Sequence, residues 1–208
     1  MFEKINQQGS ILLHSDIAKI REYATNHKVP IIQDEGLVFL IQLIKIKKPL
    51  RILEIGTAIG YSAIQMTRFS EAMIDTIERN PEMVQLARDN IKTFHYGDRI
   101  FVIEADALEL DLTKLKSTYD IIFIDAAKAQ YQKFFERFSP LLSEDGIIIS
   151  DNLAFHGFVY DDQIKSKNIR GLVRKIEQYI NWLAQHPNFN SLFFDIGDGM
   201  AVSERKSK

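Results

Sequence analysis

Acidic or amide side chains follow four successive apolar runs of this sequence. The runs, each with the polar residues that come after it, are 73–77 with Glu78, 100–103 with Asp106, 119–124 with Asp125, and 146–150 with Asp151 and Asn152. Ligands of open α/β sheets bind outside the carboxyl ends of the strands, so parallel strands would gather these side chains at one rim. Single acids are common in solvated loops. An acid or amide after each of four strands favours a ligand site.

The last members of this set offer only oxygen atoms as ligands: Asp125, Asp151 and Asn152. Oxygen ligands of low charge suit Mg²⁺, which keeps open positions for water and substrate. The alternative is that these side chains only cap turns. Lys128 follows Asp125 by three residues, so a helical turn would place both on one side. Beside a divalent cation the pKa of its ammonium would fall and it could accept a proton; otherwise it is an ordinary surface lysine.

A glycine-containing turn, Gly56-Thr-Ala-Ile-Gly60, follows the first apolar run. It lacks the G-x-G-x-x-G spacing of dinucleotide-binding folds, and glycines also serve turns that bind nothing. Glu78, at the end of the neighbouring strand, could accept hydrogen bonds from both hydroxyls of a ribose. Asp106 could accept one from an adenine amino group. These sites together predict a cofactor that contains a nucleoside but no pyrophosphate.

The elements that must position these residues alternate between short apolar runs and longer amphipathic segments, which is typical of an α/β fold. The runs 121–124 and 147–149 are continuously apolar, as in strands buried on both faces of a parallel sheet. We therefore expect a doubly wound sheet with helices on both sides. Segments 192–196 and 200–203 flank a Gly-Asp-Gly turn, which indicates a hairpin. The strands expected are 51–55, 73–77, 100–103, 119–124 and 146–150, and the longer helices 16–27, 33–48, 80–91 and 169–185.

The composition is that of one globular domain. The 208 residues carry 26 Lys and Arg against 28 Asp and Glu, a net charge of −2, with 46% hydrophobic residues and no cysteine. These values exclude disordered, collagen-like and coiled-coil classes, as well as thiolate catalysis and cysteine-based metal sites. The longest apolar stretch, 37–46, is too short to span a bilayer, and the first ten residues do not resemble a signal peptide. We expect a cytoplasmic protein without membrane contact.

Five longer motifs contain these residues: R-I-L-E-I-G-T-A-I-G-Y-S-A-I (51–64), T-I-E-R-N (76–80), D-A-L-E-L (106–110), Y-D-I-I-F-I-D-A-A-K-A-Q-Y (119–131) and D-G-I-I-I-S-D-N (145–152). They resemble the motifs of a known family, the Mg²⁺-dependent, S-adenosylmethionine-dependent O-methyltransferases of the catechol and caffeoyl-CoA type. The resemblance runs from V-P-I-I (29–32) to G-D-G-M-A-V-S (197–203). Within the family the chain is similar to the bacterial branch that converts wobble 5-hydroxyuridine of tRNA into 5-methoxyuridine.

The resemblance implies a class I S-adenosylmethionine methyltransferase fold: one domain over 1–208, with a Rossmann-like, seven-stranded, mostly parallel sheet and a C-terminal antiparallel hairpin. It implies N-terminal helices within 1–48, a substrate-side loop at 153–170, and a homodimer. It places Mg²⁺ on Asp125, Asp151 and Asn152, with Asp125 and Lys128 as catalytic residues. The acid that holds the second catechol hydroxyl in the family has no clear counterpart after Asn152. The residues it assigns to S-adenosylmethionine are Ile32, Gly56, Ser62, Glu78, Asp106, Ala107 and Asp125.

A cationic segment comes after the proposed metal ligands. Residues 163–175 contain no acid and five basic residues: Lys165, Lys167, Arg170, Arg174 and Lys175. An RNA substrate needs such a surface for its phosphates, and it would present the base in a single-stranded anticodon loop. The alternative is a solvated helix face. The leading hypothesis is a tRNA 5-hydroxyuridine methyltransferase, and the alternative is a small-molecule, catechol-type O-methyltransferase.

Overall fold

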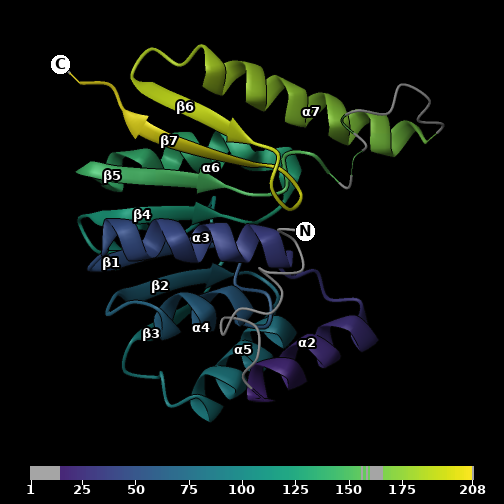
Figure 1. Ribbon diagram of the computed structural model, residues 1–208, viewed down its shortest axis with the longest axis vertical. Coiled ribbons are helices and arrows are strands. Elements are labelled where there is room, and N and C mark those ends of the chain that lie inside the picture. The colour runs from purple at the N-terminus through teal and green to yellow at the C-terminus, as the bar shows by residue number, and fades with distance from the viewer. Residues whose placement is uncertain (1–14, 156, 158, 160–165, 208) are drawn as a thin grey trace.

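A seven-stranded sheet forms the centre of the molecule, in the order β3-β2-β1-β4-β5-β7-β6 (Figure 1). The computed structural model describes residues 15–155, 157, 159 and 166–207. Strands β1 to β5 are parallel to their neighbours, and β7 runs antiparallel to both β5 and β6. The doubly wound sheet and its C-terminal antiparallel hairpin are thereby confirmed. The strands are β1 (Arg51–Ile55), β2 (Met73–Glu78), β3 (Ile100–Glu104), β4 (Tyr119–Ile124), β5 (Leu142–Ser150), β6 (Phe189–Phe194) and β7 (Met200–Arg205).

Helices cover both faces of this sheet, with α3 in front of it and α6 behind it in Figure 1. Asn80 caps one of them, since its side chain accepts a hydrogen bond from Glu82 N at 2.9 Å, and Pro81 takes the first helical position as expected. Among the described residues no helix is long and apolar enough to cross a membrane. The α-helices are α2 (Ser15–His27), α3 (Asp34–Lys47), α4 (Tyr61–Arg68), α5 (Pro81–Thr93), α6 (Tyr131–Phe138) and α7 (Lys167–Ala184).

Two hydrophobic cores lie on opposite faces of the sheet, and β4 belongs to both. Ile121 and Phe123 pack into the core built with α2, α3, α4 and α5. Ile122 and Ile124 pack into the core built with α6 and α7. All four side chains are fully buried, which explains why this run of the sequence is continuously apolar. The expectation of a strand covered on both sides is confirmed.

The largest differences from the expected boundaries are at β6, β5 and α7. Strand β6 is Phe189–Phe194 and not 192–196. Strand β5 begins at Leu142, four residues before the expected start, because Leu142 is buried and pairs with Tyr119. The acidic pair Glu144-Asp145 inside the strand broke the apolar pattern. The expected loop 153–170 is also too long: α7 begins at Lys167, where the Ser166 side chain accepts a hydrogen bond from Ile169 N. Its last residues therefore belong to a helix.

Candidate functional site

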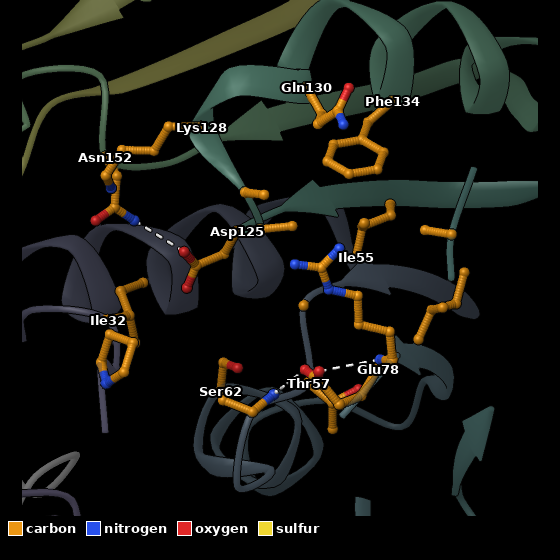
Figure 2. A pocket seen from close by; sticks show the side chains of 18 of the residues that line it. Ile32, Ile55, Thr57, Ser62, Glu78, Asp125, Lys128, Gln130, Phe134 and Asn152 are labelled. Atoms are coloured by element: carbon orange, nitrogen blue, oxygen red, sulfur yellow. Dashed lines mark hydrogen bonds between the residues drawn. The ribbon is translucent and has the colours of Figure 1, made fainter. Parts of the chain in front are cut away.

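A cavity of about 530 Å³ opens at the carboxyl ends of the parallel strands. Its volume lies within the range of sites for small organic ligands. Segment 30–33 and Leu172 of α7 complete the wall. Figure 2 shows Asp125 and Asn152 on one side of this cavity and Glu78 on another. The expected site residues that line it are Ile32, Gly56, Ser62, Glu78, Asp106, Ala107, Asp125, Lys128 and Asn152.

Gly56 lies where the ends of β1 and β4 approach each other. Its φ is +106°, and a Cβ at this position would stand 1.9 Å from the backbone oxygen of Asp125. The two strand ends are joined here by a hydrogen bond from Asp125 N to Ile55 O at 2.9 Å. Any side chain would force them apart. The sequence interpretation assigned this glycine to the approach of a ligand, and the structure adds the approach of a neighbouring strand.

Glu78, at the end of β2, has its carboxylate fixed by the backbone. Oε2 accepts a hydrogen bond from Ala58 N at 3.0 Å, and Oε1 accepts one from Arg79 N at 3.0 Å (Figure 2). Oε1 also accepts a hydrogen bond from Asn80 N at 2.9 Å. A carboxylate has about four acceptor positions, so it can still accept from a ligand hydroxyl. The Glu78 side chain is thus oriented by Ala58 of the Gly56–Gly60 turn and by the backbone of the two residues that follow Glu78.

Asp106 lies on the rim beyond β3 and is more exposed than Glu78. Its Oδ1 accepts a hydrogen bond from Leu108 N at 2.9 Å, which closes a local turn. Its Oδ2 lies 3.7 Å from Nη1 of Arg79, an exposed ion pair across the mouth of the cavity. Ala107, the next residue, is buried in the wall.

The three expected metal ligands meet at the ends of β4 and β5. Nδ2 of Asn152 donates a hydrogen bond to Oδ1 of Asp125 at 2.8 Å, and the backbone N of Asn152 donates to Oδ1 of Asp151 at 2.7 Å. Asp151 is buried behind Asn152 and does not line the cavity. Burial raises the pKa of both carboxyls; the charge of Asp198 adds to the effect on Asp125, and that of Asp125 to the effect on Asp151.

Lys128 begins a short 3₁₀ turn, η2 (Lys128–Gln130), beside this cluster. Burial lowers the pKa of its ammonium, although the charges of Asp198, Asp125 and Asp151 oppose the shift. The Nζ atom also lies 5.4 Å from the centre of the Phe155 ring. The sequence interpretation attributed the lowered pKa to a metal ion; in this structure the cause is desolvation.

Asp198 is an acid of this cluster that the sequence interpretation missed. It lies in the turn between β6 and β7, is 4% exposed, and acts electrostatically on both Asp125 and Lys128. The turn is tied to the segment after β5 by hydrogen bonds from Leu153 N to Gly199 O at 2.9 Å and from Ala154 N to Asp198 O at 2.7 Å. The Gly-Asp-Gly pattern indicated a hairpin, and nothing in it pointed to β5.

A second group of residues that the sequence interpretation missed holds segment 30–33 in the wall of the cavity. The Arg21 guanidinium on α2 makes a two-pronged pair with the Asp34 carboxylate at the start of α3, with Nη2 to Oδ2 at 2.8 Å. Its Nη1 also donates to the Tyr61 hydroxyl at 3.3 Å. Because Asp34 follows the lining segment 30–33 directly, this pair fixes that segment against α4.

Four of the five basic residues of the cationic segment 163–175 lie on α7, next to the cavity. Lys167, Arg170, Arg174 and Lys175 are all exposed, and Leu172 of the same helix lines the cavity. Residues three or four apart share a helix face, so Lys167, Arg170 and Arg174 form one stripe. Lys165 lies outside the described residues.

Known proteins share both the sequence pattern and the fold. Residues 7–206 match a family model described as O-methyltransferase. The chain is 30% identical over 193 residues to a candidate caffeoyl-CoA O-methyltransferase of Arabidopsis thaliana, with 90% of this chain and 83% of that protein covered.

Two solved structures superpose over nearly the whole chain. A candidate caffeoyl-CoA O-methyltransferase of Staphylococcus aureus is 42% identical, with a TM-score of 0.88 and 93% of each chain covered. A methyltransferase of Podospora anserina, solved with S-adenosylhomocysteine bound, is 26% identical, with a TM-score of 0.86 and 99% of this chain and 94% of that chain covered.

Proposed function

Because the chain belongs to the O-methyltransferase family, we propose that it transfers the methyl group of S-adenosylmethionine to an oxygen atom of its substrate. The observation that carries the proposal is one cavity with two chemically different sides. Glu78 offers oriented acceptor atoms on one side, and the other side carries Asp125, Asn152 and Lys128. The related Podospora methyltransferase binds S-adenosylhomocysteine, the product that such a transfer would leave.

The residues on the Glu78 side fit the methyl donor. A carboxylate held by three backbone N–H groups can take the two hydroxyls of a ribose, as acids at this position do in nucleotide-binding folds. Asp106, on the rim beyond the next strand, would accept a hydrogen bond from the adenine amino group. Ser62, Ile32 and Gly56 would then surround the remainder of the molecule, toward the ends of β1 and β4.

The residues on the other side fit a hard divalent cation such as Mg²⁺. Asp151 is buried and Asp125 is partly buried, and Asn152, whose amide nitrogen donates to Asp125 in this structure, could add its amide oxygen if the amide turned. Such a donor set is stabilised by a cation, because the cation compensates the burial of the two negative charges. When bound there, the cation would supply Lewis-acid stabilisation of an acceptor oxyanion.

The chain's own residues would orient the acceptor oxygen and take its proton. In the proposed step an oxygen–carbon bond forms, the carbon–sulfur bond of the methyl donor breaks, and the acceptor proton passes to Nζ of Lys128. A lysine with a lowered pKa, as burial gives Lys128, suits this role. Most of the gain in rate would come from alignment of the acceptor with the methyl group.

For the substrate, we propose 5-hydroxyuridine at the wobble position of tRNA. Its 5-hydroxyl and 4-carbonyl are vicinal oxygens, as the two hydroxyl oxygens of a catechol are. The stripe of Lys167, Arg170 and Arg174 supports an RNA substrate, because it is exposed on the helix that also supplies Leu172 to the cavity. Phosphate contacts of this kind give most of the affinity for nucleic acids.

A second candidate is a small catechol-type substrate. The related proteins of Arabidopsis and Staphylococcus carry names that refer to caffeoyl-CoA, a small molecule. Both candidates use the same chemistry, and they differ only in the surface around the cavity.

Methyl transfer to both classes of acceptor tests the proposal. The purified protein with Mg²⁺ and labelled S-adenosylmethionine is offered tRNA that carries 5-hydroxyuridine or a simple catechol, and the nucleosides are identified by mass spectrometry. The variant Lys167→Glu/Arg174→Glu should raise the KM for tRNA roughly tenfold or more and leave the catechol reaction unchanged. The control Lys45→Glu/Lys48→Glu reverses two exposed charges near the amino end of β1, away from the cavity. Turnover of catechol alone would support the second candidate, and no methyl transfer to either would refute the first proposal.

A further inference from the structure

Glu54 is a fully buried acid directly beneath the cavity, in the middle of β1. Its Oε1 accepts a hydrogen bond from the Ser62 hydroxyl on α4, and its Oε2 accepts one from the Thr76 hydroxyl on β2 at 2.5 Å. Thr76 in turn shares a hydrogen bond of 2.6 Å with the Thr57 hydroxyl. Ser62 and Thr57 both line the cavity. A chain of hydroxyls thus connects a buried carboxyl to the methyl-donor side of the site.

The surroundings of Glu54 disfavour its ionised form. Burial raises the pKa of this carboxyl to about 8, and the negative charges of Asp125, just after β4, and of Glu78 on β2 add to the effect. The two hydroxyl donors oppose it without cancelling it. A raised pKa favours the protonated form of Glu54 at neutral pH, which is the general response of a buried acid without a compensating cation.

The protonation state of Glu54 decides whether a hydroxyl of this chain is free to donate a hydrogen bond into the cavity. If Glu54 is ionised, Ser62 and Thr76 both donate to it and Thr57 donates to Thr76, so every hydroxyl proton is engaged inside the protein. If Glu54 is neutral, it donates one proton itself, and one hydroxyl of the chain is released to donate elsewhere. Because Glu54 touches Ser62 directly, the shortest rearrangement releases the Ser62 proton toward the cavity.

We propose that Glu54 is a positioning residue which, as a neutral carboxylic acid, donates to Ser62 and turns the Ser62 hydroxyl proton toward an acceptor atom of the bound methyl donor. The inference rests on the proposed function for the identity of the ligand. The protonated state of Glu54 is a property of the protein alone. Binding is then linked to pH: the competent form is the neutral one, and affinity falls as pH rises through the pKa of Glu54.

The first test needs no ligand. Infrared difference spectra between the wild-type protein and Glu54→Gln should show, at pH 7, the carbonyl stretch of one protonated carboxylic acid that disappears at high pH. Glutamine keeps one donor and one acceptor of a neutral acid, so the variant should fold. A spectrum with only the carboxylate bands of Glu54 at pH 7 would overturn the proposal, whatever the protein binds.

The second test measures the affinity for S-adenosylhomocysteine by calorimetry between pH 6.5 and 9.5. For linkage to one proton the wild-type affinity should fall up to about tenfold per pH unit above the pKa of Glu54. The amino group of the ligand also titrates near pH 8, but it does so equally for every variant. The difference in slope between wild-type protein and Glu54→Gln therefore isolates Glu54.

Two further variants test whether Glu54 acts through Ser62 or through a general effect on α4. Ser62→Ala should bind roughly tenfold or more weakly at pH 7, from the loss of one hydrogen bond to the ligand, and should lose the Glu54-dependent slope. Thr67→Val removes another buried hydroxyl of α4, which donates to Ala63 O at 2.9 Å, and should keep the wild-type profile. A slope that persists in Glu54→Gln or in Ser62→Ala would overturn the proposal. Wild-type protein that binds no S-adenosylhomocysteine would refute the proposed function, while the infrared result would still decide the state of Glu54.

Discussion

Replacement of Gly56 by alanine should damage both the fold and the cavity. The backbone there has φ of +106°, and a left-handed conformation costs a residue with a Cβ roughly 1–2 kcal/mol. The new Cβ would also stand 1.9 Å from the Asp125 backbone oxygen. An ordinary C···O contact is about 3.3 Å, so the ends of β1 and β4 must separate by roughly 1.4 Å. That separation breaks the Asp125 N to Ile55 O hydrogen bond, a further loss of about 1 kcal/mol.

The matched control is Gly157→Ala. Gly157 has φ of +80°, yet no atom of the described part of the chain lies within 4 Å of its would-be Cβ. It therefore carries the conformational cost without the steric one. With the same conformational cost in both variants, Gly56→Ala should lower the free energy of unfolding by about 2–3 kcal/mol and the Tm by roughly 4–12 °C, against about 1–2 kcal/mol and roughly 2–8 °C for the control.

Calorimetric unfolding and titration with S-adenosylhomocysteine check both effects. The displaced strand ends carry the floor of the cavity, so Gly56→Ala should also bind the ligand at least tenfold more weakly, while Gly157→Ala binds as the wild type. Equal losses of Tm in the two variants would refute the reasoning. So would a Gly56→Ala protein with full affinity.

Three other changes have definite expected results. Arg21→Gln breaks the two-pronged pair with Asp34 and should lower the free energy of unfolding by about 1–2 kcal/mol; a double-mutant cycle with Asp34→Asn should recover a coupling of the same order. Asp198→Asn removes a neighbouring negative charge and should lower the pKa of Asp125, measured by carboxyl-carbon NMR; an unchanged pKa would contradict the placement of Asp198. Without divalent cations the folded protein binds more protons than the unfolded chain at Asp125 and Asp151, so stability should fall as pH rises above 4. Added Mg²⁺ should raise the Tm more at pH 8 than at pH 5, and Asp151→Asn should abolish that difference.

The sheet and its order of elements were predictable because the apolar runs have the length and continuity of buried strands. Ile121 to Ile124 shows why: its residues alternate between two cores, and both faces demand apolar side chains. The start of β5 was not predictable, since Glu144 and Asp145 lie in a strand where the sheet leaves them exposed. The periodicity of apolar residues indicates buried side chains, so it does not predict the exposed part of a strand.

The site residues at the strand ends were predictable from topology alone, because parallel strands bring their carboxyl ends together. Glu78, Asp125 and Asn152 indeed face one cavity. Asp198 and Arg21 were not, because each reaches the site through a tertiary contact between segments far apart in the chain. The sequence places Glu54 in an apolar strand and says nothing of its burial. Its two hydroxyl partners, Ser62 and Thr76, come from α4 and β2, so the contact depends on how these elements pack against β1.

The turn between β6 and β7 supplies the last part of the site to be synthesised. Synthesis proceeds from the N-terminus, so α2, α3 and the strands β1 to β3, which include the Glu78 side of the cavity, leave the ribosome before β4 and β5. Asp198 and the backbone that holds Leu153 and Ala154 come last. The acid cluster at the ends of β4 and β5 is therefore complete only after the whole C-terminal hairpin has been made and has packed against the segment that follows β5.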